Sequence, residues 1–411
     1  MSEKPWIGPY WHVSPYNFAP EVRASLDIPE RVTIYDVTLR DGEQCPGVVF
    51  RKGDKINIAR KLDELGVNRI EAGFPAVSDE DFQTVKEIAG LGLKAKVKAF
   101  SRAMRADIDL ALKAGVSGLT IELPSSQKLI KTGYNWTPED VVNKAVEASL
   151  YAKSHGLQVS FFCIDSTRAD ADFLRRLSMA VVNEGKADAL TIVDTFGVVN
   201  PIGFQHLIKL VKSWVRVPVE VHVHNDLGLA TANSVAGVTA GAEVVHTNVN
   251  GLGERSGGAS LEEVAVVLRV LYGIELGIDY SKLVELSHMV QEISHVKNSP
   301  TKPVVGENSF TYEAGIAVMF SYRFAKADYL QGALPYLPEF VGNDFRIVLG
   351  KKSGSYSVQW ELEKLGWRAT DSEIGEILKK VKEEGTATRK AISSRRFLEI
   401  AKNILKNTNS S

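Results

Sequence analysis

The sequence predicts an α/β fold: a (β/α)8 TIM barrel with a C-terminal lid and linker and a small helical subdomain. Three observations support the barrel. Eight short β-rich runs alternate with amphipathic helical stretches, and the runs begin roughly 25–40 residues apart, which leaves room for a strand, a loop and a helix each time. Polar residues suited to chemistry also stand at the ends of five of these runs. The predicted strands are Val32–Leu39, Arg69–Phe74, Lys96–Phe100, Gly118–Pro124, Gln158–Asp165, Ala189–Thr195, Val219–Asn225 and Val244–Gly251.

Amphipathic helices are expected between these strands. After the first strand, apolar residues recur every three or four positions from Ile56 to Leu65, and Gly66 then ends the helix. After the eighth strand, the same spacing runs from Leu261 to Leu271. A doubly wound sheet is the alternative, but such a sheet usually has fewer strands and binds its ligand at one switch point. Candidate chemistry at five strand ends therefore favours the barrel.

The barrel occupies residues 31–285 in this prediction. Residues 1–30 are rich in Pro, Trp and Tyr and are expected to form an N-terminal arm. The stretch KNSPTKPVVGENSF breaks the barrel pattern with prolines and a glycine, so residues 286–351 are assigned to a linker and lid subdomain. Residues 352–411 contain three amphipathic helical patterns and are assigned to a small helical C-terminal subdomain.

Charge and cysteine content narrow the class of protein. The net charge is −1, so bulk charge gives no indication of nucleic-acid binding. A chain of 411 residues with only two cysteines, Cys45 and Cys163, is typical of a reducing, cytoplasmic compartment rather than of a disulfide scaffold. The N-terminus shows no secretory signal pattern, and the longest apolar runs are of strand length, so we expect no contact with a membrane.

A metal site is predicted from the ends of the first and seventh strands. Asp41 follows the first strand, and His222 and His224 lie two residues apart on the seventh. Alternate residues of a strand face the same side, so both imidazoles point one way. One carboxylate and two imidazoles make a three-ligand site with open positions, which suits Mn or Zn and also allows Mg. Arg40, beside the predicted ligand, can stabilise a developing oxyanion.

Three sequence blocks carry a family resemblance: LRDGEQ at 39–44, HVHNDLG at 222–228 and NGLGER at 250–255. Together and in this order they resemble the 2-isopropylmalate synthase and homocitrate synthase family, within the metal-dependent TIM-barrel Claisen-type synthases and lyases. The resemblance implies an acyltransferase of amino-acid biosynthesis that joins an acyl-CoA, usually acetyl-CoA, to a 2-oxo acid and releases CoA. It also implies a divalent metal and a domain-swapped homodimer.

The same resemblance suggests further site residues. Thr195, at the end of the sixth strand, matches a threonine that binds the carboxylate of the 2-oxo acid, although a strand threonine can also simply satisfy the backbone. Gln44 either orders the Arg40 cluster or contacts the substrate. Glu254 either anchors its loop through an ion pair with Arg255 or acts in the site.

Several departures from the family pattern concern the substrate pocket. A histidine with which homocitrate synthases bind the distal carboxylate of 2-oxoglutarate corresponds to Phe74 here. A serine and a glutamate of the fifth strand correspond to Phe162 and Ile164. A more apolar pocket disfavours a second carboxylate. We therefore expect a monocarboxylic 2-oxo acid, such as 2-oxoisovalerate or pyruvate, to lie against Phe74 and Phe162.

Two further departures concern catalysis. An asparagine near the metal corresponds to Gly258, and a histidine of the lid corresponds to Ala317. Tyr322, five residues farther on, matches a tyrosine of the lid in homocitrate synthases. The resemblance therefore makes Tyr322 of the partner subunit the candidate for proton relay.

The expected function is thus a metal-dependent Claisen-type condensation of an acyl-CoA with a 2-oxo acid. Alternatives are a homocitrate- or citrate-type synthase and a carbon–carbon lyase of the hydroxymethylglutaryl-CoA lyase type. Such lyases carry a Gly-Cys loop near the barrel mouth, and neither Cys45 nor Cys163 lies in that context. A third alternative, a catalytically impaired paralogue with a binding role, is suggested by Ala317 and Gly258 and opposed by the retained metal ligands and Arg40.

Overall fold

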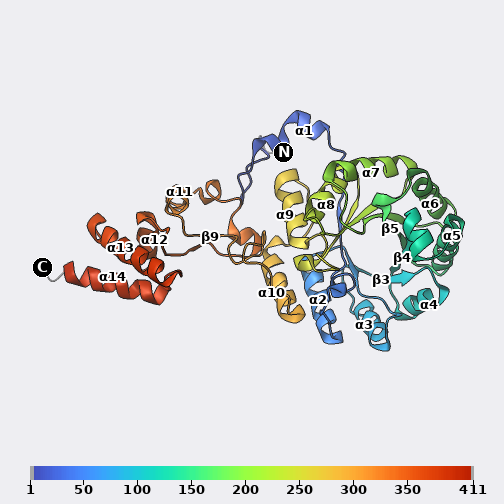
Figure 1. The fold of residues 1–411 in the computed structure, drawn as a ribbon, viewed down its shortest axis with the longest axis horizontal. Coiled ribbons are helices and arrows are strands. Elements are labelled where there is room, and N and C mark those ends of the chain that lie inside the picture. The colour runs from blue at the N-terminus through green and yellow to red at the C-terminus, as the bar shows by residue number, and fades with distance from the viewer. Residues whose placement is uncertain (1–3, 409–411) are drawn as a thin grey trace. The chain divides into compact units, whose positions relative to one another are not determined.

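The computed structural model describes residues 4–408, which form two compact units. One unit is Tyr16–Asn298, and the other combines the chain up to Pro15 with the chain from Ser299 onward. Figure 1 shows the first unit as strands enclosed by a ring of helices. The TIM barrel predicted from the strand spacing is confirmed. None of the described helices is long and apolar enough to cross a membrane.

Eight parallel strands close the barrel in sequence order, and β1 pairs with β8 through Thr33 and Val244. The strands are β1 (Thr33–Asp36), β2 (Arg69–Glu71), β3 (Lys96–Arg102), β4 (Gly118–Pro124), β5 (Gln158–Ile164), β6 (Ala189–Asp194), β7 (Val219–Val223) and β8 (Val244–Thr247). The helices that follow them are α2 (Lys52–Leu65), α3 (Asp79–Ala89), α4 (Arg105–Ala114), α5 (Pro138–Ser154), α6 (Ala171–Asn183), α7 (Pro201–Trp214), α8 (Ala230–Thr239) and α9 (Leu261–Tyr272). Helices α1 (Pro20–Ala24) and α10 (Leu283–Ser294) complete this unit.

The first strand ends earlier than the sequence predicts, at Asp36 rather than Leu39. The Asp36 carboxylate accepts a hydrogen bond from the Thr38 amide at 3.0 Å. The Val37 carbonyl then accepts from the amides of Arg40 and Asp41 at 3.1 and 2.8 Å. These bonds turn the chain out of the sheet, so Arg40 and Asp41 stand on a turn at the carboxyl end of the barrel.

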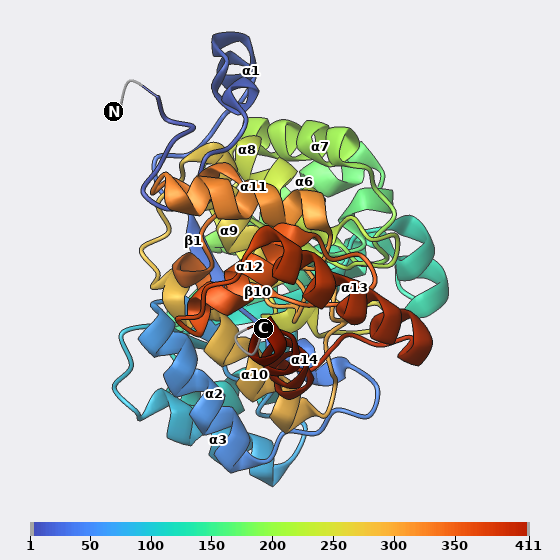
Figure 2. The ribbon, with the colours of Figure 1, turned by 90° about the vertical axis from the view of Figure 1, so that its left-hand side faces the viewer.

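The second unit is mainly helical. A short parallel pair, β9 (Thr311–Tyr312) and β10 (Arg346–Ile347), accompanies α11 (Gly315–Lys326), α12 (Ser355–Lys364), α13 (Asp371–Thr388) and α14 (Ser394–Thr408). Figure 2 shows these four helices together with the strand β10. Buried apolar residues of the last three helices, among them Leu362, Ile377 and Phe397, form their own core. The three amphipathic patterns near the C-terminus therefore correspond to three packed helices.

The barrel interior contains a buried carboxylate, that of Glu220 on β7. Arg69 forms an ion pair with its Oε1 at 2.7 Å, and the Ser160 hydroxyl donates to the same oxygen at 3.0 Å. The Thr191 hydroxyl and the His246 Nε2 contact Oε2 at 3.0 and 3.1 Å. Residues from four strands therefore meet at one carboxylate.

Burial alone would raise the pKa of Glu220, but the hydrogen bond with His246 and the charges of Lys98 and Arg69 outweigh it and hold the pKa well below its usual range. A carboxylate with a lowered folded-state pKa stabilises the fold above its unfolded-state pKa, and this contribution is lost as the pH falls. The Glu220 contribution is therefore present at neutral pH and declines below about pH 4.5.

We predict that Glu220→Gln lowers the free energy of unfolding by about 3–5 kcal/mol at pH 7, because it leaves the partly buried Arg69 and the buried Lys98 without their counter-charge. Urea unfolding followed by circular dichroism measures this difference. The control is Glu147→Gln, because the Glu147 ion pair with Arg105 is exposed on both sides and should contribute about 1 kcal/mol or less. Equal effects of the two variants would contradict the role assigned to Glu220.

Candidate metal centre and active site

The three predicted metal ligands converge at the carboxyl end of the barrel. Asp41, His222 and His224 are buried, and one ligand atom from each lies within 4.8 Å of the other two. The two Nε2 atoms of the histidines are 3.3 Å apart, and His222 Nε2 is 3.8 Å from Asp41 Oδ1. A carboxylate and two imidazoles at this spacing form a donor set for a divalent cation.

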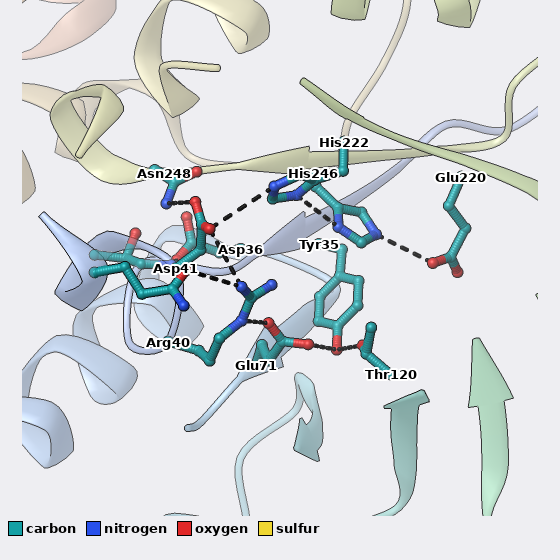
Figure 3. A network of polar contacts seen from close by, with 12 residues as sticks. Tyr35, Asp36, Arg40, Asp41, Glu71, Thr120, Glu220, His222, His246 and Asn248 are labelled. Atoms are coloured by element: carbon teal, nitrogen blue, oxygen red, sulfur yellow. Dashed lines mark hydrogen bonds and ion pairs between the residues drawn. The ribbon is translucent and has the colours of Figure 1, made fainter. Parts of the chain in front are cut away.

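Neighbouring side chains fix the orientation of these donors, as Figure 3 shows. The Asn248 amide donates to Asp41 Oδ2 at 3.1 Å, and Arg40 Nη1 donates to Asp41 Oδ1 at 3.2 Å. His222 Nδ1 lies 3.3 Å from His246 Nδ1, so one side of the His222 ring is held against β8. Outer contacts of this kind fix the ring orientation in metal sites.

The protonation state of His222 also suits a metal ligand. Burial lowers its pKa well below the usual value, and the electrostatic interactions with His224, His246 and Arg40 act in the same direction. The ring is therefore neutral at physiological pH, which is the form that binds metals. His224 Nδ1 is buried and has no hydrogen-bond partner among residues 4–408. A neutral His222 ring beside the Asp41 carboxylate fits a divalent ion.

Arg40 is held rigidly beside this centre. Its Nε donates to Glu71 Oε2 at 2.6 Å, and its guanidinium lies 4.4 Å from the centre of the Phe100 ring. Glu71 is itself held by the Tyr35 hydroxyl at 3.2 Å (Figure 3). Burial would lower the Arg40 pKa, but Glu71 and Asp41 outweigh it and raise the pKa, so the cation is permanent. Its Nη2 is buried without a partner in the described chain and can donate to a ligand.

One cavity of about 640 Å³ connects these groups with most of the other predicted residues. The predicted site residues that line it are Arg40, Asp41, Gln44, Phe74, Phe162, Thr195, His222, His224 and Glu254. Tyr322 belongs to the other compact unit, on α11, where its hydroxyl donates to Glu363 at 2.6 Å.

Three of the lining residues have contacts that bear on the alternatives left open by the sequence. The Thr195 hydroxyl accepts from the Asp165 amide at 2.8 Å, which leaves its own proton available to a ligand. The Gln44 side-chain oxygen accepts a hydrogen bond from Arg40 Nη1 at 3.4 Å. Glu254 accepts from Arg255 at 3.0 Å while still lining the cavity. Each of these three side chains therefore makes a contact that holds it in place and also lines the cavity.

Aromatic rings form one wall of the cavity. Phe74 and Phe162 each meet Phe100 edge to face, with ring centres 5.5 and 6.4 Å away respectively. Phe162 also meets His222 edge to face at 5.0 Å. The apolar wall expected from Phe74 and Phe162 therefore reaches the metal ligands.

Several residues that shape the site were not predicted from the sequence. Glu71 and His246 were each detectable as a polar residue inside an apolar strand, but their partners were not. Asn248 lies close to Gly258: a Cβ atom at position 258 would come 2.8 Å from the Asn248 amide oxygen. The Asn248 amide thus occupies the space beside Asp41 that a larger residue at 258 would need. Glu122, at the end of β4, lines the same cavity.

Comparison with known proteins agrees with this geometry. The HMGL-like family model matches residues 31–290. A protein named homocitrate synthase from Methanothermobacter thermautotrophicus is 40% identical over 96% of this chain and 98% of its own length. A putative (R)-citramalate synthase from Archaeoglobus fulgidus is 44% identical over 86% of this chain and 72% of its own. A probable 2-isopropylmalate synthase from Methanopyrus kandleri is 43% identical over 87% of this chain and 70% of its own.

Solved structures show the same fold at lower identity. The hydroxymethylglutaryl-CoA lyase of Bacillus subtilis superposes with a TM-score of 0.60 and 21% identity, over 67% of this chain and 97% of that one. The resemblance inferred from the three sequence blocks is confirmed by the synthases, which match at about 40% identity along most of their length. This chain belongs to the HMGL-like family.

Proposed function

We propose that this chain is a synthase that condenses acetyl-CoA with a 2-oxo acid and releases CoA. The observation that carries the proposal is the shared cavity, in which the Asp41, His222 and His224 donors stand beside an arginine with a free N–H group. The names of the relatives, all synthases of this reaction type, support it. A screen of CoA release from acetyl-CoA with a panel of 2-oxo acids tests it, and absence of CoA release across the panel would contradict it.

Asp41, His222 and His224 would hold Mn, Zn or Mg. A bound divalent cation supplies a Lewis acid that polarises the keto group of the 2-oxo acid. Arg40 Nη2 is placed to donate to the oxygen on which negative charge develops. Thr195 can donate its hydroxyl proton to the substrate carboxylate, while Gln44 keeps the Arg40 guanidinium in position.

The cysteines give no support to the lyase alternative. Burial raises the pKa of the Cys163 thiol well above its usual range, so this thiol is not reactive. The chain also retains the proposed metal donors and the Arg40 contacts, which argues against a catalytically impaired paralogue that only binds ligands. The synthase therefore remains the function that the site supports best.

We predict that His222→Ala and His224→Ala each lose bound metal and activity, because two ligands are too few for a stable site, while the far-ultraviolet circular dichroism spectrum is unchanged. Metal is measured by mass spectrometry after gel filtration. His206→Ala, on the exposed side of α7, is the matched control and should retain both. Full metal content in the His222 and His224 variants would refute the proposed ligands.

The cavity suits an apolar substrate side chain. Phe74, Phe100 and Phe162 form its wall, and the nearby cations already have carboxylate partners. Arg102 is bound by Asp107 at 2.7 Å. Lys55 is bound by Glu43 and Asp81, and Lys128 does not line the cavity. A second substrate carboxylate would therefore lack a free counter-charge.

We predict a higher kcat/KM for a monocarboxylic 2-oxo acid than for 2-oxoglutarate, with about 1–3 kcal/mol of discrimination for each well-placed methylene. Steady-state kinetics with 2-oxoisovalerate, pyruvate, 2-oxoglutarate and oxaloacetate measure the preference. Phe74→His should shift it toward 2-oxoglutarate, whereas Phe74→Leu should not. A wild-type preference for 2-oxoglutarate or oxaloacetate would contradict the proposal that the pocket favours an apolar substrate side chain.

We further propose a homodimer in which Tyr322 of one subunit serves the barrel of the other. Tyr322→Phe and His222→Ala should each be inactive or severely impaired as homodimers. Mixed under subunit exchange, they should recover about one quarter of wild-type activity, because half the dimers are mixed and each mixed dimer contains one intact site. Sedimentation velocity checks the dimer, and absence of complementation despite demonstrated exchange would place Tyr322 outside the partner's site.

A further inference from the structure

Glu122 is a carboxylate of the active-site cavity to which neither the sequence blocks nor the metal geometry assigns a role. It lies near the carboxyl end of β4 and lines the cavity together with Arg40, His222 and His224. Thr120, two residues earlier on β4, hydrogen-bonds to Tyr35 inside the barrel at 3.0 Å. Because alternate strand residues share a face, Glu122 points into the barrel above Thr120.

The neighbouring strands leave Glu122 without a partner. In the register of the sheet it stands between Arg102 on β3 and Phe162 on β5. The Arg102 guanidinium is held by both carboxylate oxygens of Asp107, at 2.7 and 3.0 Å. No hydrogen bond or ion pair of Glu122 is found among residues 4–408.

Arg40, which also lines the cavity, makes its ion pairs with other carboxylates. Its Nε and Nη1 donate to Glu71 and Asp41, at 2.6 and 3.2 Å. Phe162 on the adjacent strand offers no donor. Glu122 is half-buried, and a carboxylate withdrawn from solvent without a partner is costly in a folded protein, so its presence at a substrate cavity suggests a functional role.

The electrostatic surroundings place the pKa of Glu122 at about 7. Burial is the largest cause of the increase; Arg40 and Arg102 oppose it, and the carboxylates of Glu71 and Glu254 add to it. Tyr134, which follows β4, also senses this charge. A general base works most efficiently when its pKa lies near the working pH, because it can then both accept a proton and release it again.

The proposed condensation needs a base for the methyl group of acetyl-CoA, and the metal donors are committed to another role. We propose that Glu122 is this general base. The assignment rests on the proposed function. The carboxylate takes a proton from the methyl carbon, and the C–H electron pair moves into the enolate, which attacks the keto carbon of the 2-oxo acid. The keto C=O π pair moves to oxygen and gives an alkoxide, which takes up one proton in place of the proton that Glu122 removed, so that the Glu122 carboxylate is restored. Water then breaks the C–S bond, giving a carboxylate, the CoA thiol and a proton.

Kinetics of Glu122→Gln test the assignment. Gln has nearly the same shape but cannot accept the proton, so kcat should fall by about 10²–10⁴-fold. Bound metal and the KM for the 2-oxo acid should stay close to wild type. Glu147→Gln, an exposed glutamate on the following helix α5, is the control and should leave all three unchanged.

Two further measurements separate a base from a residue that only shapes the pocket. The wild-type kcat/KM profile should fall on the acid side with an apparent pKa of about 7, and Glu122→Gln should lack this limb. Glu122→Asp keeps a carboxylate at a shorter reach, so it should retain partial activity and show an increased isotope effect with acetyl-CoA deuterated at the methyl group.

Each outcome bears on a separate statement. If wild-type protein releases CoA and Glu122→Gln remains within threefold of its kcat, Glu122 is not the base, while the proposed function stands. A raised KM with an unchanged acid limb makes Glu122 a substrate contact and also overturns the assignment. If wild-type protein releases no CoA with any 2-oxo acid, the proposed function fails and the base assigned to it fails as well.

Discussion

The organisation of the site depends on one constraint: charged groups buried inside the barrel require partners. Glu220 is met by Arg69 and His246, and the Arg40 guanidinium is met by Glu71 and Asp41. Each of these contacts restricts a side chain to one orientation. The ion pairs and hydrogen bonds inside the barrel therefore fix the orientation of the side chains that reach the cavity.

The same constraint identifies where a ligand would bind. Among the residues that line the cavity, the polar groups that remain free are informative. Arg40 Nη2 and His224 Nδ1 lack partners in the described chain, and the Glu122 carboxylate has no hydrogen bond or ion pair there. They come from three different strand ends and share one cavity. A charged hydrogen-bond donor, an imidazole of the proposed metal site and a carboxylate that can accept a proton together fit the proposed enolate condensation.

Differences from the family pattern are compensated by neighbouring residues. Gly258 lacks the amide that the family resemblance places there, and the Asn248 amide lies in the adjoining space while binding Asp41. Phe74 and Phe162 replace polar groups, and the cavity wall that they form with Phe100 is continuous. The Asp41, His222 and His224 group and Arg40 are thus retained beside an apolar wall, which supports the proposed synthase and its proposed preference for an apolar substrate side chain.

The sequence by itself determined the eight βα units, the family and the Asp41, His222 and His224 group, because these depend on local periodicity and short spacings. Two histidines at alternate positions of one strand must share a face whatever surrounds them. Only the tertiary structure decided the end of β1 at Asp36, the pairing of Glu220 with His246, the exchange of space between Asn248 and Gly258, and the unpaired state of Glu122. These features depend on the register between strands and on which of several nearby charges each side chain reaches. Barrel closure sets both through contacts between residues far apart in the chain.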